Sequence, residues 1–135
     1  MTRLPRTLVN RLLSQAQQSA EIEVCGLIGR DAEGRLHVYP VPNVAREPGR
    51  LFQMDPAGQI DAMRRMREGG ESLFAIYHSH PHAPAEPSAT DLQEAAYPEA
   101  LYLIISLNTE GVLEMRGYRL GDGHVRPVEL EVVEE

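Results

Sequence analysis

The sequence contains little cysteine, few aromatic residues and no long apolar run. Among its 135 residues are one cysteine, two phenylalanines and no tryptophan. A single cysteine excludes an intramolecular disulfide and is typical of proteins in a reducing compartment. Residues 1–18 intersperse arginines with leucines, whereas a signal peptide has a continuous apolar core, and no other segment is apolar enough to span a bilayer. We therefore expect a cytoplasmic protein without a membrane partner.

Basic residues are scarce relative to acidic ones. Thirteen Lys and Arg stand against twenty Asp and Glu, so the net charge is −7 and no basic stripe is available to neutralise phosphates. Nucleic acid is therefore not an expected partner. With 42% hydrophobic residues the chain is too apolar to be disordered, and its length suffices to enclose one core. The sequence predicts a single domain over residues 1–135.

The hydrophobic pattern predicts alternating helices and strands, which is typical of an α/β protein. Helices are expected over 5–19, from Pro56 (capped by Asp55) to the Gly69-Gly70 pair, and over 88–97. Strands are expected over 22–30, 35–42, 51–54, 73–78, 100–107, 112–119 and 123–132. Apolar stripes place Leu8, Leu12, Leu13 and Ala16 of the first helix, and Ile60, Met63 and either Met66 or Arg67 of the second, toward the core.

Two histidines stand two positions apart where the expected strand 73–78 ends. The segment reads His78-Ser79-His80-Pro81, and side chains at i and i+2 of an extended segment point to the same side, so both imidazoles can reach one ion. Asp91 can supply a third ligand. Two histidines and one carboxylate match the three protein ligands of catalytic zinc sites, which leave a fourth position for water.

The segment after these histidines admits more than one interpretation. Ser88-x-x-Asp91 also fits a helix capping box, and Thr90 with Gln93 forms a competing one. Residues 81–87 contain three prolines and are expected to form a loop over the site. His82 and Glu86 lie in this loop, where solvated residues are favoured over spare ligands or substrate contacts.

An acidic residue that can act as a base lies upstream, at Glu21 or Glu23. The following residues are apolar and bounded by glycine, as in a buried strand, and alternation places Glu23, Cys25 and Leu27 on one face. Spacing does not choose between the two glutamates. Cys25 lies inside the apolar run, where a small buried hydrophobe is favoured over a nucleophile.

These motifs together resemble a known family. Glu23-x-Cys25-Gly26-Leu27, followed by His78-Ser79-His80-Pro81-x₆-Ser88-x-x-Asp91, is similar to the JAMM (MPN-plus) metalloisopeptidases, in particular their small prokaryotic members. Phe52-Gln53-Met54-Asp55-Pro56 and the stretch 102–107 are also similar, so the likeness extends roughly from Pro5 to Val128.

The resemblance implies a cytidine-deaminase-like α/β fold in which helices flank a central mixed sheet. It implies one Zn²⁺ ion held by His78, His80 and Asp91, with Glu23, rather than Glu21, as the general base and Ser88 as a donor to the developing oxyanion. The implied substrate is a ubiquitin-like protein or sulfur carrier with a flexible Gly-Gly tail, cut at the peptide or isopeptide bond after that tail. Residues 51–54 are expected to offer a strand edge to such a tail.

Two other functional classes fit parts of the pattern. An inactive scaffold of the same fold that binds protein partners would be expected to lack one or more ligands, whereas every motif position is filled. A zinc hydrolase or deaminase of a small molecule is the second alternative. The cysteine pair that usually completes a deaminase site is absent, because Cys25 is the only thiol.

Overall fold

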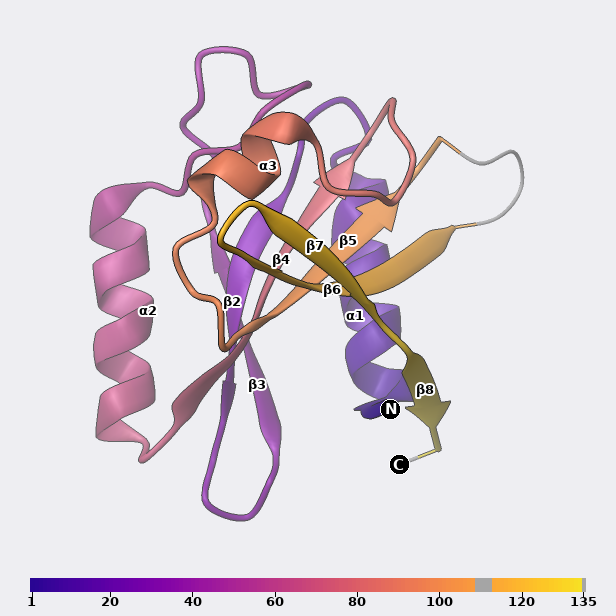
Figure 1. Ribbon diagram of the computed structural model, residues 1–135. Helices are drawn as coiled ribbons and strands as arrows, with labels where there is room; N and C mark the ends of the chain where they lie inside the picture. The colour runs from indigo at the N-terminus through magenta and orange to yellow at the C-terminus, as the bar shows by residue number, and fades with distance from the viewer. Residues whose placement is uncertain (109–112, 135) are drawn as a thin grey trace.

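The computed structural model describes residues 1–108 and 113–134 and contains a six-stranded mixed sheet with helices on both faces (Figure 1). In chain order the elements are β1 (Thr2–Pro5), α1 (Arg6–Gln18), β2 (Cys25–Arg30), β3 (Leu36–Val41), α2 (Pro56–Glu68), β4 (Ser72–His80), α3 (Ala89–Glu94), β5 (Leu101–Ser106), β6 (Glu114–Gly121), β7 (His124–Val128) and β8 (Leu130–Val133). The predicted α/β class, with a central mixed sheet and flanking helices, is confirmed.

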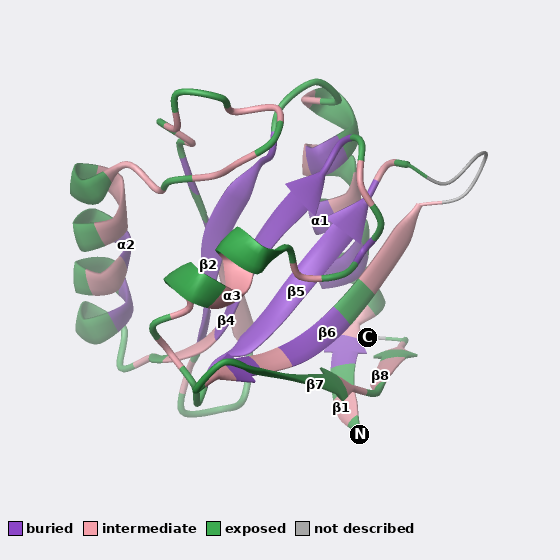
Figure 2. Ribbon diagram, turned by 45° about the horizontal axis from the view of Figure 1, so that its top comes forward, coloured by how far each residue is buried: buried purple, intermediate pink, exposed green. Residues whose placement is uncertain are grey.

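The sheet has the strand order β3-β2-β4-β5-β6-β7. Strands β4 and β5 run parallel, and every other neighbouring pair in that order is antiparallel. β4 is therefore an inner strand, and Figure 2 shows it buried along most of its length while α3 lies exposed above the sheet. The histidine motif is thus carried by one of the most rigidly paired strands of the fold.

Apolar side chains form one cluster on each face of the sheet. The cluster on the α1 face includes Leu8, Leu12, Ala16, Val24, Ile28, Ala75 and Tyr77. The cluster on the face covered by α2 and α3 includes Leu27, Ala62, Met66, Ile76 and Ile104. Consecutive residues of β2 and β4 enter opposite clusters because side chains alternate along a strand. The predicted inward stripe of the first helix is confirmed, although Leu13 is only partly buried.

The prediction for the inner face of α2 is partly wrong. Ala62 and Met66, one turn apart, are its buried residues, and Met63 is partly buried. Ile60 is 69% exposed. Each residue advances about 100° around a helix, so a position two residues before Ala62 faces solvent. The predicted cap is confirmed, because the Asp55 carboxylate accepts a hydrogen bond from the amide of Gly58 at 3.1 Å.

Both chain ends differ from the prediction. Residues 2–5 form β1, which pairs in parallel with β8 in a separate two-stranded sheet. The expected strand 123–132 is divided at Glu129 into β7 and β8, because β8 leaves the large sheet to join β1. Pro5 consequently ends β1 and precedes the helix instead of opening it. The strand predicted over 112–119 corresponds to β6, and its predicted first residue, 112, lies outside the described residues.

Two further boundaries are shorter than predicted. Strand β2 begins at Cys25 rather than at residue 22, so Glu23 precedes it. Helix α3 ends at Glu94 rather than at residue 97. Pro98 disfavours a helical conformation at Tyr97, whose amide instead donates to the Tyr102 hydroxyl at 3.2 Å. Among the described residues, no helix has the length and apolarity needed to cross a membrane.

Candidate metal centre and active site

The two motif histidines occupy the C-terminal end of β4. Alternation directs His78 and His80 to the α2/α3 face, together with Ile76, and directs Ser79 to the opposite face with Tyr77. Both imidazoles are buried. Their Nε2 atoms lie 3.1 Å apart, so the two side chains converge as the i, i+2 spacing predicts.

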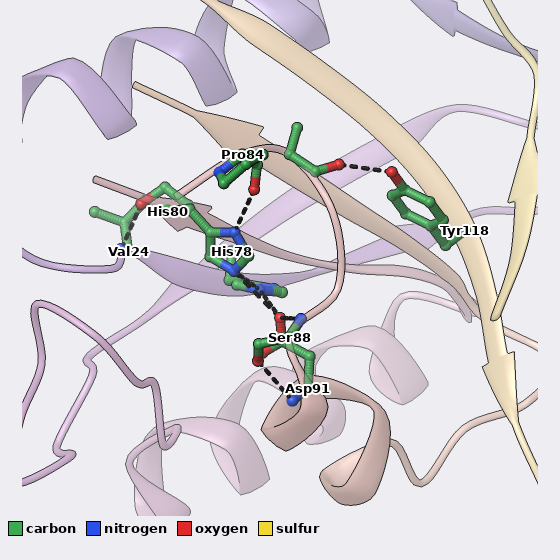
Figure 3. Close-up of polar contacts among 9 residues, drawn as sticks. Val24, His78, His80, Pro84, Ser88, Asp91 and Tyr118 are labelled. Atoms are coloured by element: carbon green, nitrogen blue, oxygen red, sulfur yellow. Dashed lines mark hydrogen bonds and ion pairs between the residues drawn. The ribbon is translucent and has the colours of Figure 1, made fainter. Parts of the chain in front are cut away.

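Asp91 completes a triangle of electron-pair donors. Its Oδ2 atom lies 3.1 Å from Nε2 of His78 and 3.2 Å from Nε2 of His80 (Figure 3). Ligands of a tetrahedral ion at about 2 Å are separated by about 3.3 Å, so these three atoms stand near the positions that a zinc ion requires. The donor set and its spacing fit a metal ion.

Hydrogen bonding of the second imidazole nitrogen supports this fit. Nδ1 of His80 lies 2.8 Å from the carbonyl oxygen of Pro84, which can only accept, so Nδ1 carries the proton (Figure 3). In the neutral ring Nε2 then presents a lone pair toward Asp91. Carbonyl groups commonly orient metal-binding histidines in this way.

His78 is held by packing instead. Its ring stacks on Phe52, with ring centroids 4.4 Å apart and an interplanar angle of 24°. Its Nδ1 atom has no hydrogen-bond partner among the described residues. Burial lowers the pKa of His78, although Asp91 acts in the opposite direction, and this favours the neutral ring that a metal ligand requires.

The segment from Ser88 to Asp91 forms the capping box that its spacing also fits. The amide of Asp91 donates to Oγ of Ser88 at 3.0 Å, and the amide of Ser88 donates to Oδ2 of Asp91 at 2.9 Å. This capping box starts α3 at Ser88, so the alternative box from Thr90 does not form. Oγ of Ser88 is an acceptor here, and its hydroxyl hydrogen remains available to donate toward the site.

The ionised form of Asp91 is strongly favoured. Burial acts to raise its pKa, but the adjacent imidazoles of His78 and His80 outweigh burial and hold the pKa of Asp91 far below its ordinary range. The cap to Ser88 acts in the same direction. The carboxylate is the form that a metal ligand requires.

Glu23 lies beside the histidines and is two residues before the start of β2. It is 4% exposed, and one of its carboxylate oxygens lies within 4.8 Å of ligand nitrogens of His78 and His80. Burial raises the pKa of Glu23 to about 7, and the effect of His80 in the opposite direction is smaller. Its Oε1 atom lacks a hydrogen-bond partner within the described part of the chain. A buried, unpaired carboxyl that titrates near neutrality suits a general base.

Glu21 occupies a different environment. Its side chain is 88% exposed, and its Oε2 atom lies 3.8 Å from Nε2 of His82. His82 and Glu86 are exposed loop residues, and neither belongs to the cluster of metal-binding atoms. Cys25 is buried, and burial raises the pKa of its thiol to about 12, which argues against a nucleophile.

Two side chains whose roles the sequence does not reveal fix the backbone of Glu23. Oγ of Ser79 accepts from the amide of Val24 at 2.9 Å, which ties the residue after Glu23 to the histidine strand. Nδ2 of Asn43 donates to the carbonyl of Glu23 at 2.9 Å. Ser79 stands between the motif histidines, so its position was the only available signal; Asn43 lies in an expected surface loop and offers none.

Asn43 also explains why residues 51–54 do not form the predicted strand. Its side chain donates to the carbonyl of Leu51 at 3.0 Å and accepts from the amides of Ala45 and Gln53, both at 3.0 Å. Only an isolated antiparallel bridge joins Asn43 to Met54 in the described structure. Backbone groups that a strand would offer are thus used to shape the loop that carries Phe52.

A cavity of about 780 Å³ opens beside the cluster. Its floor includes Leu27, Ile76 and Tyr102 from the sheet. One wall is the loop over 45–54, and the opposite wall is α3 with the segment 95–97. His78 and Asp91 line the same cavity, so a bound chain has direct access to the candidate metal centre.

Comparisons with known proteins agree with this geometry. The family model described as prokaryotic homologs of the JAB domain matches residues 5–120. The CysO-cysteine peptidase of Mycobacterium tuberculosis is 34% identical over 132 residues, which cover 95% of this chain and 88% of the peptidase. The desampylase of Haloferax volcanii is 36% identical over 101 residues, which cover 70% of this chain and 73% of the desampylase.

Solved structures share the fold. A solution structure of a protein from Desulfitobacterium hafniense aligns with a TM-score of 0.85 at 35% identity, covering 100% of this chain and 94% of that one. The crystal structure of a JAB1/MPN domain protein from Archaeoglobus fulgidus aligns with a TM-score of 0.64 at 22% identity, covering 99% and 100% of the two chains, and supports the fold alone. The chain therefore belongs to the prokaryotic homologs of the JAB domain, the small JAMM proteins that its motifs resemble.

Proposed function

We propose that residues 1–135 form one zinc metallopeptidase domain, which hydrolyses the peptide or isopeptide bond after the Gly-Gly tail of a ubiquitin-like or sulfur-carrier protein. One observation carries the proposal: three buried electron-pair donors converge within 3.2 Å, beside the buried and unpaired carboxyl of Glu23. The names of the relatives, a desampylase and a CysO-cysteine peptidase, point to the same class of reaction.

His78, His80 and Asp91 are the proposed ligands of one zinc ion per chain. Asp91 is preferred to Glu23 as the third ligand, because its Oδ2 is 3.1 and 3.2 Å from the two Nε2 atoms, whereas the Glu23 oxygen lies only within 4.8 Å. When bound, zinc supplies Lewis-acid polarisation of a water molecule and of the scissile carbonyl. Glu23 is thereby left free for proton transfer.

Glu23 and Ser88 are the proposed catalytic residues. The carboxylate of Glu23 accepts a proton from the attacking water and returns it to the leaving amine. The Ser88 hydroxyl, whose oxygen already accepts from Asp91, donates to the carbonyl oxygen as negative charge develops on it. The leaving amine departs protonated, and the carrier ends in a free glycine carboxylate.

The cavity limits how the substrate tail lies. A tail whose scissile carbonyl reaches His78 and Asp91 passes between the loop 45–54 and α3, and glycine is the residue least hindered by two such walls. Asn43 occupies the carbonyl of Leu51 and the amide of Gln53, so a tail that adds as a strand to residues 51–54 would pair with the backbone of Phe52 on the other side. The proposed compartment is the cytoplasm, where a lone reduced cysteine is the rule.

The test is cleavage of carriers that bear a short extension after Gly-Gly. Mass spectrometry should find a product ending at Gly-Gly, and a chelator should abolish its formation. A matched carrier with Val-Val should lose at least about a hundredfold in kcat/KM, the scale expected when a reacting centre is displaced by about an ångström. Equal cleavage of the Val-Val carrier, or cleavage of no Gly-Gly carrier in a broad panel, would favour a hydrolase of small molecules.

A further inference from the structure

The segment over 81–88, here called the site loop, joins β4 to α3 and is held down by side chains of the sheet. Three successive carbonyl oxygens of this loop accept hydrogen bonds. Ala83 accepts from Oγ of Ser106 at 2.8 Å. Pro84 accepts from Nδ1 of His80 at 2.8 Å, and Ala85 accepts from the Tyr118 hydroxyl at 2.6 Å (Figure 3). The donors Ser106, His80 and Tyr118 lie on β5 and on its two neighbours in the sheet, β4 and β6.

The backbone of the site loop makes few hydrogen bonds within the loop itself. Residues 81, 84 and 87 are prolines and have no amide hydrogen to donate. Within the described residues the loop makes one internal backbone hydrogen bond, from the amide of Glu86 to the carbonyl of Pro84 at 2.8 Å. Its position therefore depends on the side-chain donors beneath it.

Water cannot readily replace the Tyr118 hydroxyl at the Ala85 carbonyl. Ser106, Tyr118 and Ala85 are all buried, at 0%, 5% and 1% exposure. Loss of the Tyr118 hydroxyl would leave the Ala85 carbonyl buried without a partner, an arrangement that folded proteins avoid. The loop would then be expected to shift until water reaches that carbonyl.

Such a shift would affect the candidate metal centre at two points of the loop. At its middle, the Pro84 carbonyl fixes the proton of His80 on Nδ1, which leaves Nε2 as a lone pair. At its end, Ser88 caps α3 and exchanges two hydrogen bonds with Asp91. Two proposed ligands and the proposed oxyanion donor therefore depend on the same short segment.

We propose that Tyr118 and Ser106 are positioning residues of the active site. Their hydroxyl groups hold the site loop so that His80 keeps its Nδ1 proton and Asp91 faces the histidines. The inference rests on the proposed metal site, but not on the identity of the substrate.

The test compares Tyr118→Phe, Ser106→Ala and the double variant with Tyr39→Phe. Tyr39 is a matched control, because it is a nearly buried tyrosine of the same core cluster whose hydroxyl donates to Glu71 instead. Zinc affinity, measured by competition with a chromogenic chelator, should fall about tenfold in Tyr118→Phe, the scale of losses at groups that orient metal ligands. The value of kcat should fall with KM within twofold of wild type, and Tyr39→Phe should change neither quantity.

Two measurements separate positioning from a general loss of stability. Long-range ¹H–¹⁵N spectra of histidine report the Nδ1 proton of His80, and hydrogen exchange reports the amides of the site loop. The Nδ1 proton of His80 and the amide protons of the site loop should both exchange at least about tenfold faster in Tyr118→Phe and Ser106→Ala than in Tyr39→Phe. This difference should hold whatever the melting temperatures of the variants are. Zinc affinities and exchange rates equal to those of the control would overturn the inference. A wild-type protein that binds no zinc would refute the proposed function instead, and the exchange rates would still decide whether these hydroxyls hold the loop.

Discussion

Replacing Glu23 by glutamine should stabilise the metal-free protein and abolish hydrolysis. The side chain is 4% exposed, and its Oε1 atom lacks a partner among the described residues. Glutamine keeps the shape of the side chain and carries no charge. The substitution therefore removes a buried charge without opening a cavity, which is an unusual case in which loss of a catalytic group improves stability.

The size and sign of the effect follow from the pKa of Glu23. Burial raises that pKa from 4.5 to about 7, so the folded chain binds this proton more tightly than the unfolded chain. Stability must then fall as pH rises from about 4.5 to about 7, and the whole penalty is present above pH 7. A shift of this size corresponds to about 3 kcal/mol at most. The variant should match wild type near pH 4 and exceed its unfolding free energy by up to about 3 kcal/mol near pH 8.

Urea denaturation of both metal-free proteins between pH 4 and pH 8 is the direct assay. Far-ultraviolet circular dichroism is the suitable signal, because the sequence contains no tryptophan. The difference between the two proteins reports Glu23 together with its electrostatic coupling to His80 and Asp91. Zinc loading should shrink the advantage of the variant, since a nearby cation favours the carboxylate of Glu23.

The control is Glu21→Gln, whose side chain is 88% exposed in wild type. It should leave stability unchanged within about 0.5 kcal/mol at every pH, as expected for an exposed surface position. Parallel stability curves for wild type and Glu23→Gln would refute the assignment of Glu23 as a buried, poorly solvated carboxyl. Zinc-loaded Glu23→Gln should also lose at least a hundredfold in kcat if Glu23 is the general base.

Further predictions concern the ligands and the loop beside them. His80→Ala or Asp91→Ala should remove most of the zinc found in purified wild type, because a three-ligand site cannot spare one ligand; Ser88→Ala should retain it, and elemental analysis distinguishes these outcomes. Glu21→Gln should retain activity in the carrier-cleavage assay, and an inactive Glu21→Gln with an active Glu23→Gln would reverse the choice of base. Asn43→Asp keeps the shape of the side chain but replaces the donors to the carbonyls of residues 23 and 51 with an acceptor, so kcat/KM should fall at least about tenfold, by the same scale that governs groups orienting a site. A value within twofold of wild type would show that the loop does not depend on Asn43.

Local features of the sequence predict the parts of the fold that depend on short-range chemistry. The Asp55 cap, the inward stripe of α1 and the alternation along β2 and β4 follow from residue types and spacing, and the structure confirms them. The family and the peptidase class of its relatives also follow from the motif, and the comparisons confirm both. The metal-binding and catalytic roles of the individual residues stay predictions.

Features that depend on long-range partners escape sequence reasoning. β1 and β8 exist because residues 2–5 and 130–133 meet, although they stand at opposite ends of the chain. Residues 51–54 have the composition of a strand, but the side chain of Asn43 takes the hydrogen bonds that a neighbouring strand would need. Ile60 is apolar and nevertheless exposed, since the rotation of α2 is set by Ala62 and Met66. In each case tertiary contacts override a local preference.

The capping box of α3 is compatible with the proposed metal-binding role of Asp91. Oδ2 of Asp91 accepts from the amide of Ser88 at 2.9 Å, and the same atom faces Nε2 of both histidines at 3.1 and 3.2 Å. The first turn of α3 therefore fixes the carboxylate before any ion arrives, and the entropy of ordering a ligand is lost on folding rather than on metal binding. The carboxylate of Asp91 also resists protonation, because both imidazoles and the cap hold the pKa of Asp91 far below its ordinary range. Spacing alone cannot separate a helix cap from a metal ligand here, because the oxygen atom that accepts the cap is the one that faces both imidazoles.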